Sequence, residues 1–273
     1  ENCVMAILFS GMYAEIRLVG NKVIKRYYPP NVLADELQRR VIAIQAYKRE
    51  LGKISFPIPH TTVEIVEEAL VIEQTRIPAH DTFISIAQAD SIKAERTVEA
   101  CFRETMKIMG ALNSERPVGY DVSMSNFVVD DQGIAVGVDL YPPRLGFREN
   151  SDGSFQRLPL AECLVDYPEA SRWPEDKVQR LQRWYYTSDG TLEHFWHIAV
   201  ASLFAAQPRL NTVDQALAQP LTQRITALML DYIAASPLSY LADGLQGHLV
   251  GDRLKIDLGY RLEKDWRRYP TCI

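Results

Sequence analysis

Three side chains with oxygen atoms cluster near the middle of the sequence, at a spacing that suits chemistry on a phosphate ester. Asp121 and Asn126 form a DxxxxN pattern directly before an apolar run, and a second apolar run ends at Asp139 after the turn 130–133. Because the two runs should pair as a hairpin, the three side chains should meet at one of its edges. Phosphoryl transfer from ATP needs such a set: an Asn and an Asp as hard oxygen ligands for Mg²⁺, and a further carboxylate that orients or deprotonates the attacking hydroxyl.

The same three residues have a plainer interpretation. Asp and Asn commonly cap turns, so Asp121, Asn126 and Asp139 could do no more than stabilise the loops around the hairpin. A DxxxxN spacing alone also occurs by chance in many chains. The context favours the chemical interpretation, because further features precede the pattern in a fixed order.

Four upstream features extend the pattern. Gly11 lies in the segment 9–16, between the expected strands 4–10 and 14–18, and the strand after these two carries Lys25. Two prolines in the segment 56–59 precede the next strands, and an extended segment at 71–75 then leads toward the helical part of the chain. In this order, together with the three oxygen-bearing residues, the features resemble the kinase-like phosphotransferase superfamily, specifically its aminoglycoside phosphotransferase and choline kinase branch.

The resemblance covers approximately residues 9–145 and implies a role for each matched residue. Asp121 is implied to be the catalytic base, with Asn126 and Asp139 as the ligands of Mg²⁺. Lys25 is implied to grip the α and β phosphates of ATP. The other implied nucleotide-binding residues are Gly11 in the hairpin that covers the phosphates, Glu73 and Thr75 in the segment whose backbone binds adenine, and Glu36 as the partner of Lys25.

Two positions depart from the family pattern. The family usually carries a histidine two residues before the catalytic Asp, where this chain has Gly119. The helix acid that pairs with Lys25 should lie near 41–45, where no acid is present, so Glu36 is preferred over the later Glu50. These departures leave a second interpretation open, in which the chain is a relative of the family that binds nucleotide without catalysing a reaction.

The elements that must position these residues follow from periodicity and turn signals. Short β-rich runs bounded by Gly-Asn and Pro-Pro predict strands, and apolar residues at helical spacing predict helices. The expected strands span 4–10, 14–18, 22–28, 61–66 and 69–73, with the hairpin inside 118–138. Helices are expected over 33–51, where Gly52 should end the helix, over most of 82–111, and from about residue 160 onward, with a core of Trp173, Trp184, Phe195, Leu203, Leu228 and Ile233.

Composition narrows the class of protein. The chain has 273 residues and a net charge of −5 with no long run of either sign, which argues against a nucleic-acid or anionic-membrane surface. No apolar run is long enough for a membrane helix. The four cysteines are scattered without a CxxC pair, which is typical of unpaired thiols in a reducing compartment, so a cytoplasmic location is expected.

Three further groups each have two interpretations. His194 and His197 favour packing or surface roles over a metal pair, because the nearby glutamate is misplaced for an HExxH motif. The aromatic run 184–186 could enclose a quaternary ammonium group, but its helical spacing is more typical of a core. Arg144 and Arg148 could contact a phosphate or an anionic substrate, or could simply be exposed.

The sequence thus predicts an α+β, protein-kinase-like two-lobed fold, with a small β-rich lobe containing one helix at 1–75 and a larger helical lobe at 76–273. The expected function is ATP- and Mg-dependent transfer of the γ-phosphoryl group to a hydroxyl of a small molecule. The alternatives are a pseudokinase-like regulatory or scaffold protein and another ATP-dependent transfer such as nucleotidylation. Neither the acceptor nor the oligomeric state follows from the residues.

Overall fold

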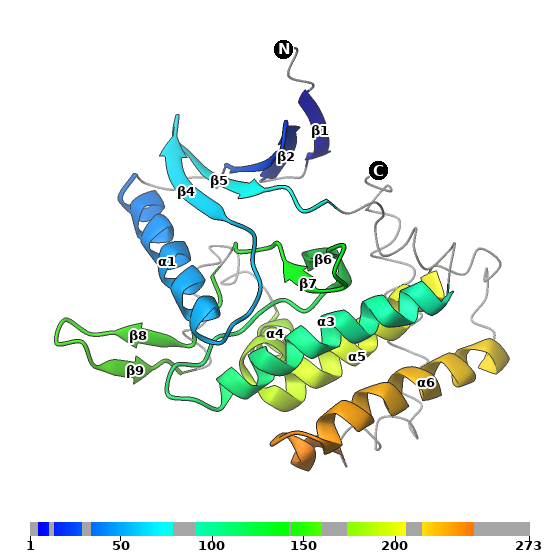
Figure 1. Ribbon diagram of the computed structural model, residues 1–273. Helices are drawn as coiled ribbons and strands as arrows, with labels where there is room; N and C mark the ends of the chain where they lie inside the picture. Colours follow the sequence, from blue (N-terminus) through cyan, green and yellow to red (C-terminus); the bar gives the residue numbers. More distant parts are fainter. Residues whose placement is uncertain are drawn as a thin grey trace.

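An antiparallel sheet is built from the first part of the chain. The computed structural model describes residues 5–10, 14–28, 34–78, 91–141, 143–159, 174–205 and 215–242. The sheet has five strands in the order β1-β2-β3-β5-β4 (Figure 1). They are β1 (Met5–Ser10), β2 (Ala14–Val19), β3 (Lys22–Tyr27), β4 (Thr61–Val66) and β5 (Ala69–Thr75). The expected strands are confirmed, with small differences at their ends.

The turn between β4 and β5 holds two residues in a left-handed conformation. Val66 pairs with Ala69, so Glu67 and Glu68 form a two-residue loop, and their φ angles are 49° and 61°. Loops of this kind favour glycine and asparagine, because a side chain with a β-carbon is strained at positive φ.

Glu68→Gly should raise the free energy of unfolding by about 1 kcal/mol, because glycine adopts this conformation without strain. Glu67 stays in place, since its carboxylate pairs with Arg26 at 2.7 Å. Urea denaturation measures the change. The control is Glu64→Gly at an exposed position of β4, which should lower stability by about 0.5–1 kcal/mol. A Glu68→Gly protein that is less stable than the wild type would contradict the prediction.

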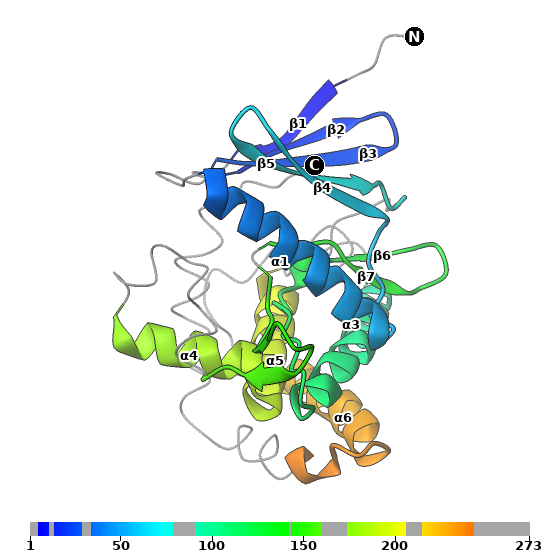
Figure 2. The same ribbon diagram turned by 90° about the vertical axis from the view of Figure 1, so that its left-hand side faces the viewer.

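Helix α1 (Ala34–Lys53) packs against β4 and β5 on one face of the sheet (Figure 2). Its buried apolar residues recur at helical spacing and are Leu37, Val41, Ile44, Tyr47 and Leu51. The helix runs past Gly52, which was expected to end it, and the chain turns at Ser55, whose φ is 54°. The backbone N–H of Ser55 donates to the carbonyl of Gly52 at 3.0 Å, which closes this end of the helix.

Helices form the opposite end of the molecule (Figure 1). Helices α3 (Ser91–Leu112), α5 (Ser188–Ala205) and α6 (Gln215–Ala234) pack against one another, and α4 (Glu175–Tyr186) packs against α5. The predicted helices are confirmed over these ranges. Of the expected core residues, Phe195 and Ile233 are buried, Trp184 and Leu228 are half-buried, and Trp173 and the side chain of Leu203 lie outside the described residues.

Two hairpins complete the fold. Strands β6 (Phe127–Val129) and β7 (Ala135–Gly137) form the expected hairpin, which contacts α3 and lies between the sheet and the helices in both ribbon views (Figures 1 and 2). Strands β8 (Phe147–Glu149) and β9 (Phe155–Arg157) form a second hairpin that the sequence analysis missed. Its sequence signal is the Asn-Ser-Asp-Gly turn between two phenylalanines.

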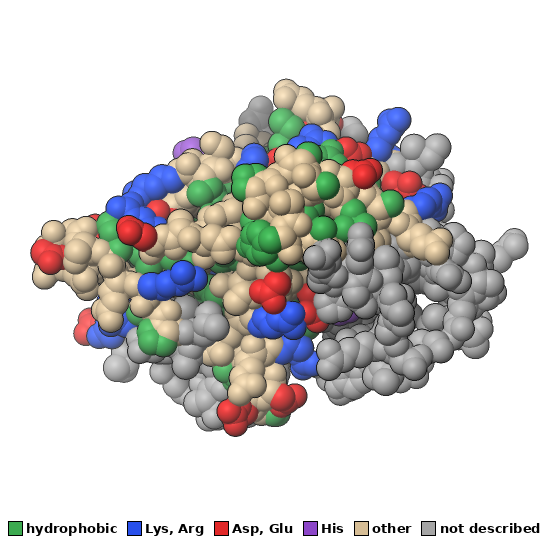
Figure 3. All heavy atoms as spheres, turned by 90° about the horizontal axis from the view of Figure 1, so that it is seen from below, with side chains coloured by type: hydrophobic (Ala, Val, Ile, Leu, Met, Phe, Trp, Pro, Cys, Tyr) green, Lys and Arg blue, Asp and Glu red, His purple; other side chains and the backbone are tan. Residues whose placement is uncertain are grey.

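One hydrophobic core runs from the sheet into the helices, and it includes Leu70 of β5, Ile44 of α1 and Phe195 of α5. The predicted α+β class is therefore confirmed. No helix in the part of the chain that the structure describes is both long and apolar enough to cross a membrane. On the face shown in Figure 3, the basic and acidic side chains of the described residues are interspersed, and neither sign gathers into a broad patch among them.

Candidate functional site

The β6–β7 hairpin brings Asp121, Asn126 and Asp139 together. Asn126 ends the short helix η1 (Met124–Asn126) directly before β6, and Asp139 follows the end of β7. The N–H of Val138 donates to the carbonyl of Asn126 at 2.9 Å, which places Asp139 beside Asn126. Asn126 Nδ2 also donates to the backbone carbonyl of Asp121 at 3.0 Å. With Nδ2 engaged in this way, Oδ1 is the atom of Asn126 that can ligate a cation.

Tyr120 holds this edge of the hairpin together, and the sequence analysis did not identify it. Its hydroxyl donates to the carbonyl of Asn126 at 2.8 Å and accepts from the backbone N–H of Asp139 at 3.2 Å. The side chain is buried, and burial raises the pKa of its hydroxyl well above the ordinary value, so the hydroxyl remains a donor. One phenol thus fixes the distance between the two residues that are candidates for metal binding.

Lys25 reaches this edge from β3. Its ammonium group is buried and donates to the carbonyl of Val138 at 2.5 Å, one residue before Asp139. Burial lowers the pKa of Lys25, and the charge of Asp139 opposes the shift. Burial likewise raises the pKa of Asp139, and the positive charge of Lys25 opposes that shift. The lysine and the carboxylate therefore act as electrostatic partners where the sheet meets the hairpin.

Glu36 does not pair with Lys25. Its carboxylate accepts instead from Arg40 Nη2, one helical turn along α1, at 2.8 Å. Within α1 and β3, which the structure describes in full, no ion pair joins Lys25 to an acid of the helix, and Glu50 pairs with Lys53 at 2.5 Å. The prediction that Glu36 is the partner of Lys25 is therefore wrong, because its carboxylate pairs with the guanidinium of Arg40, four residues further along the same helix.

Arg40 of α1 contacts the segment that follows Asp139. It is buried, and its Nη1 donates to the hydroxyl of Tyr141 at 2.5 Å. Tyr141 follows Asp139 by two positions, and its ring packs against Tyr27 of β3 in a tilted arrangement with ring centroids 4.5 Å apart. Helix α1 is thus joined to the segment beside Asp139 through an arginine and a tyrosine.

The predicted adenine-binding segment lies within the sheet. Glu73 pairs with Lys22 in an ion pair of 2.6 Å, and the backbone N–H of Thr75 donates to the carbonyl of His60 at 2.9 Å. The amide of Thr75 is therefore already engaged by the protein. Gly11, the predicted residue of the phosphate-covering turn, lies outside the described residues.

Asp121 is held by donors from several segments. Ser123 Oγ donates to its carboxylate at 2.7 Å, and the hydroxyl of Tyr185 lies at 3.4 Å. Nε2 of His194 lies 3.5 Å from the same carboxylate, whose side chain is 24% exposed. Burial raises the pKa of Asp121, but His194, Arg144 and Ser123 outweigh it, so the pKa lies well below its ordinary value. Asp121 therefore stays a carboxylate at neutral pH.

Aromatic residues of α4 form a wall beside Asp121. Trp184 stacks on His194 with ring centroids 4.2 Å apart, and Tyr185 meets the same imidazole edge-on at 6.1 Å. The buried guanidinium of Arg144 lies over the ring of Tyr185 at 3.9 Å. Trp184 and Tyr185 thus border the site. Tyr185 and Tyr186 are also buried in a hydrophobic cluster, as the core interpretation of this run expects, while Arg148 is exposed on β8.

The donor set suits a magnesium ion held by few protein ligands. Among the residues that the structure describes, no three or more His, Cys, Asp and Glu side chains form a group that could hold a metal ion. Mg²⁺ usually keeps several waters and binds one or two carboxylates together with substrate phosphates. Asp139 and the Oδ1 atom of Asn126 fit that requirement.

A cavity of about 490 Å³ lies apart from this cluster, beside the corner between α4 and α5. Its lining includes Asn113, Arg157, Arg183 and Glu193, and it contains none of the predicted site residues. Because polar groups with shifted pKa values converge at the edge of the β6–β7 hairpin, that edge, rather than this cavity, is the candidate functional site. In comparisons with known proteins, no protein-family model matches this chain, and no curated protein sequence matches it.

Proposed function

We propose that this protein transfers the γ-phosphoryl group of ATP to a hydroxyl of a small molecule, with Mg²⁺. The observation that carries the proposal is the convergence of Asp121, Asn126 and Asp139 on one hairpin edge, with Lys25 arriving from the sheet. A protein that needed these residues only as turn caps would not require a buried lysine beside Asp139.

The arrangement of elements supports the proposal. In a kinase-like two-lobed fold, a β-rich lobe with one helix at 1–75 would bind the nucleotide, and a helical lobe at 76–273 would bind the acceptor. The sheet order, with α1 between β3 and β4, and the hairpin that follows α3 are compatible with that architecture. Ligands commonly bind where two such parts meet.

Each residue then has a physical task. Lys25 would hold the phosphates, and Asp139 with Oδ1 of Asn126 would hold Mg²⁺, which supplies neutralisation of the phosphate charge. Asp121 would accept a hydrogen bond from the acceptor hydroxyl and orient it. Because its pKa lies well below the ordinary value, it orients the hydroxyl more than it removes a proton before transfer. Catalysis would come mainly from positioning and charge neutralisation.

A thermal-shift experiment tests nucleotide binding. A ligand that binds only the folded protein stabilises it by about 2.7 kcal/mol at a hundredfold excess over Kd, which raises Tm by several degrees. We expect that rise with ATP and Mg²⁺ together, and we expect Asp139→Ala to abolish it because the carboxylate beside Lys25 is lost. A wild-type protein without any response at millimolar Mg-ATP would contradict the proposal.

One observation favours a second candidate, a protein that binds nucleotide without transferring phosphate. Lys25 donates to a backbone carbonyl and has no acidic partner on α1. Product analysis separates the candidates. Incubation with γ-labelled Mg-ATP and a pool of hydroxylated small molecules should give a product heavier by one phosphate. A gain of AMP would indicate nucleotidylation, and binding without any product would favour the regulatory or scaffold role.

A further inference from the structure

His194 touches the proposed catalytic carboxylate from a helix that lies far from it in the sequence. Its Nε2 atom is 3.5 Å from Oδ1 of Asp121, and the histidine side chain is only 5% exposed. The carboxylate also receives Ser123 from its own loop and Tyr185 from α4. Three segments therefore fix the orientation of one carboxylate.

Two aromatic rings enclose the imidazole of His194. Trp184 stacks on one face, with an interplanar angle of 19°, and Tyr185 meets it edge-on at 89°. Because His194 is enclosed while Asp121 keeps 24% of its side chain exposed, a substrate can reach the carboxylate but not the imidazole. His194 can act on the reaction only through Asp121.

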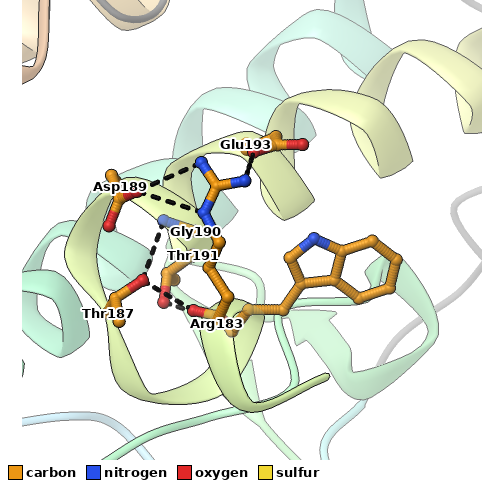
Figure 4. Close-up of polar contacts among 7 residues, drawn as sticks. Arg183, Thr187, Asp189, Gly190, Thr191 and Glu193 are labelled. Atoms are coloured by element: carbon orange, nitrogen blue, oxygen red, sulfur yellow. Dashed lines mark hydrogen bonds and ion pairs between the residues drawn. The ribbon is translucent and has the colours of Figure 1, made fainter. Parts of the chain in front are cut away.

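Close contacts at the corner between α4 and α5 (Figure 4) set the position of α5 relative to α4, and with it the position of His194 on α5. Gly190 lies so close to α4 that a β-carbon there would be 2.2 Å from the carbonyl oxygen of Arg183. Thr187 Oγ1 donates to the same carbonyl at 2.8 Å, and Thr191 Oγ1 donates to the carbonyl of Trp184 at 2.8 Å. His194 lies one helical turn after Gly190, on the side that faces Asp121.

Ion pairs lock the same corner from outside. The guanidinium of Arg183 binds Asp189 at 3.1 Å and Glu193 at 2.7 Å (Figure 4). Glu193 directly precedes His194, so the pair restrains the turn of α5 that carries the imidazole. The local structure is therefore built to hold His194 at one place.

We propose that His194 is a positioning residue for Asp121: from α5 its Nε2 atom contacts the carboxylate at 3.5 Å and holds it in the orientation that the acceptor hydroxyl requires. This inference rests on the proposed phosphoryl transfer. It explains how the loop holds its carboxylate although Gly119 offers no side chain two residues before Asp121.

Steady-state release of ADP from Mg-ATP, with water as the acceptor, tests the inference. His194→Phe keeps a flat ring against Trp184 but removes the donor. We expect kcat to fall on the order of 10- to 100-fold, since small misplacements of a reacting group have effects of this size. KM for Mg-ATP should change by no more than about threefold, because the nucleotide contacts are elsewhere. His194→Gln, which retains an N–H donor, should recover a large part of kcat.

The matched control is His197→Gln on the same helix. His197 is also buried, but its ring contact is with Trp196, and its substitution should leave kcat within about twofold. Two results would overturn the inference. The first is a His194→Phe protein with wild-type kcat. The second is a fall in kcat that comes together with a raised KM and a lowered Tm and from which His194→Gln shows no recovery. A wild-type protein that releases no ADP with either water or the pool of hydroxylated small molecules as the acceptor would overturn the proposed function itself, and the inference with it.

Discussion

Asp121→Asn should reduce phosphoryl transfer by about 10²- to 10⁴-fold, the contribution typical of a positioned acid or base group. The amide has the shape of the carboxylate and can still accept the hydrogen bond from Ser123, which lies at 2.7 Å in the wild type. The amide lacks the negative charge that attracts the proton of the acceptor hydroxyl. In the wild type, His194 lies beside this charge. The fold should therefore survive while turnover is lost.

This variant separates catalysis from nucleotide binding. Mg-ATP should still raise the Tm of Asp121→Asn, because Lys25 and Asp139 are unchanged. The control is Asp131→Asn in the exposed turn of the same hairpin, which should keep wild-type turnover. Transfer by Asp121→Asn within a few-fold of the wild type would show that Asp121 does not orient the acceptor, and the residue would then be a turn cap.

The local elements of this architecture could be predicted from the sequence. Strands, helices and the β6–β7 hairpin follow from periodicity and turn residues, which act over a few positions. Asp121, Asn126 and Asp139 lie within one short segment, so a hairpin was enough to predict their proximity. The structure places them as that spacing predicts, while their chemical roles remain proposals.

The residues that the sequence did not disclose act across large separations along the chain. His194 and Tyr185 meet Asp121 only because α4 and α5 pack against its loop, which no local pattern encodes. Glu36 was preferred as the partner of Lys25 because no acid lies near 41–45, yet its carboxylate pairs with Arg40 on the same helix at 2.8 Å. Gly119 was the available sequence signal that another segment packs against this loop, because a glycine in a site-forming loop often marks the close approach of another backbone.

The carbonyl of Tyr185 occupies the space that a side chain at position 119 would need. A β-carbon on Gly119 would lie 2.2 Å from that oxygen and 3.4 Å from the β-carbon of Arg144. The glycine cannot move aside, since its N–H donates to the carbonyl of Arg144 at 2.8 Å and its own carbonyl accepts from the hydroxyl of Tyr47 at 2.7 Å. A histidine in the loop is thus incompatible with this packing of α4.

Gly119→Ala should therefore lower the free energy of unfolding by about 3 kcal/mol or more, at the upper end of what overpacking costs in a rigid site. The displaced Tyr185 would also draw the α4–α5 corner away from Asp121, so ADP release should fall even where the protein remains folded. Urea denaturation and turnover at a temperature well below Tm measure the two effects. Gly110→Ala on an exposed turn of α3, where nothing lies within 4 Å of the added carbon, should instead stabilise the protein by about 0.5–1 kcal/mol. A Gly119→Ala protein whose free energy of unfolding lies within about 1 kcal/mol of the wild-type value, and which retains full turnover, would contradict the prediction. The carbonyl of Tyr185 would then not lie as close to the loop as the 2.2 Å distance to the added β-carbon requires.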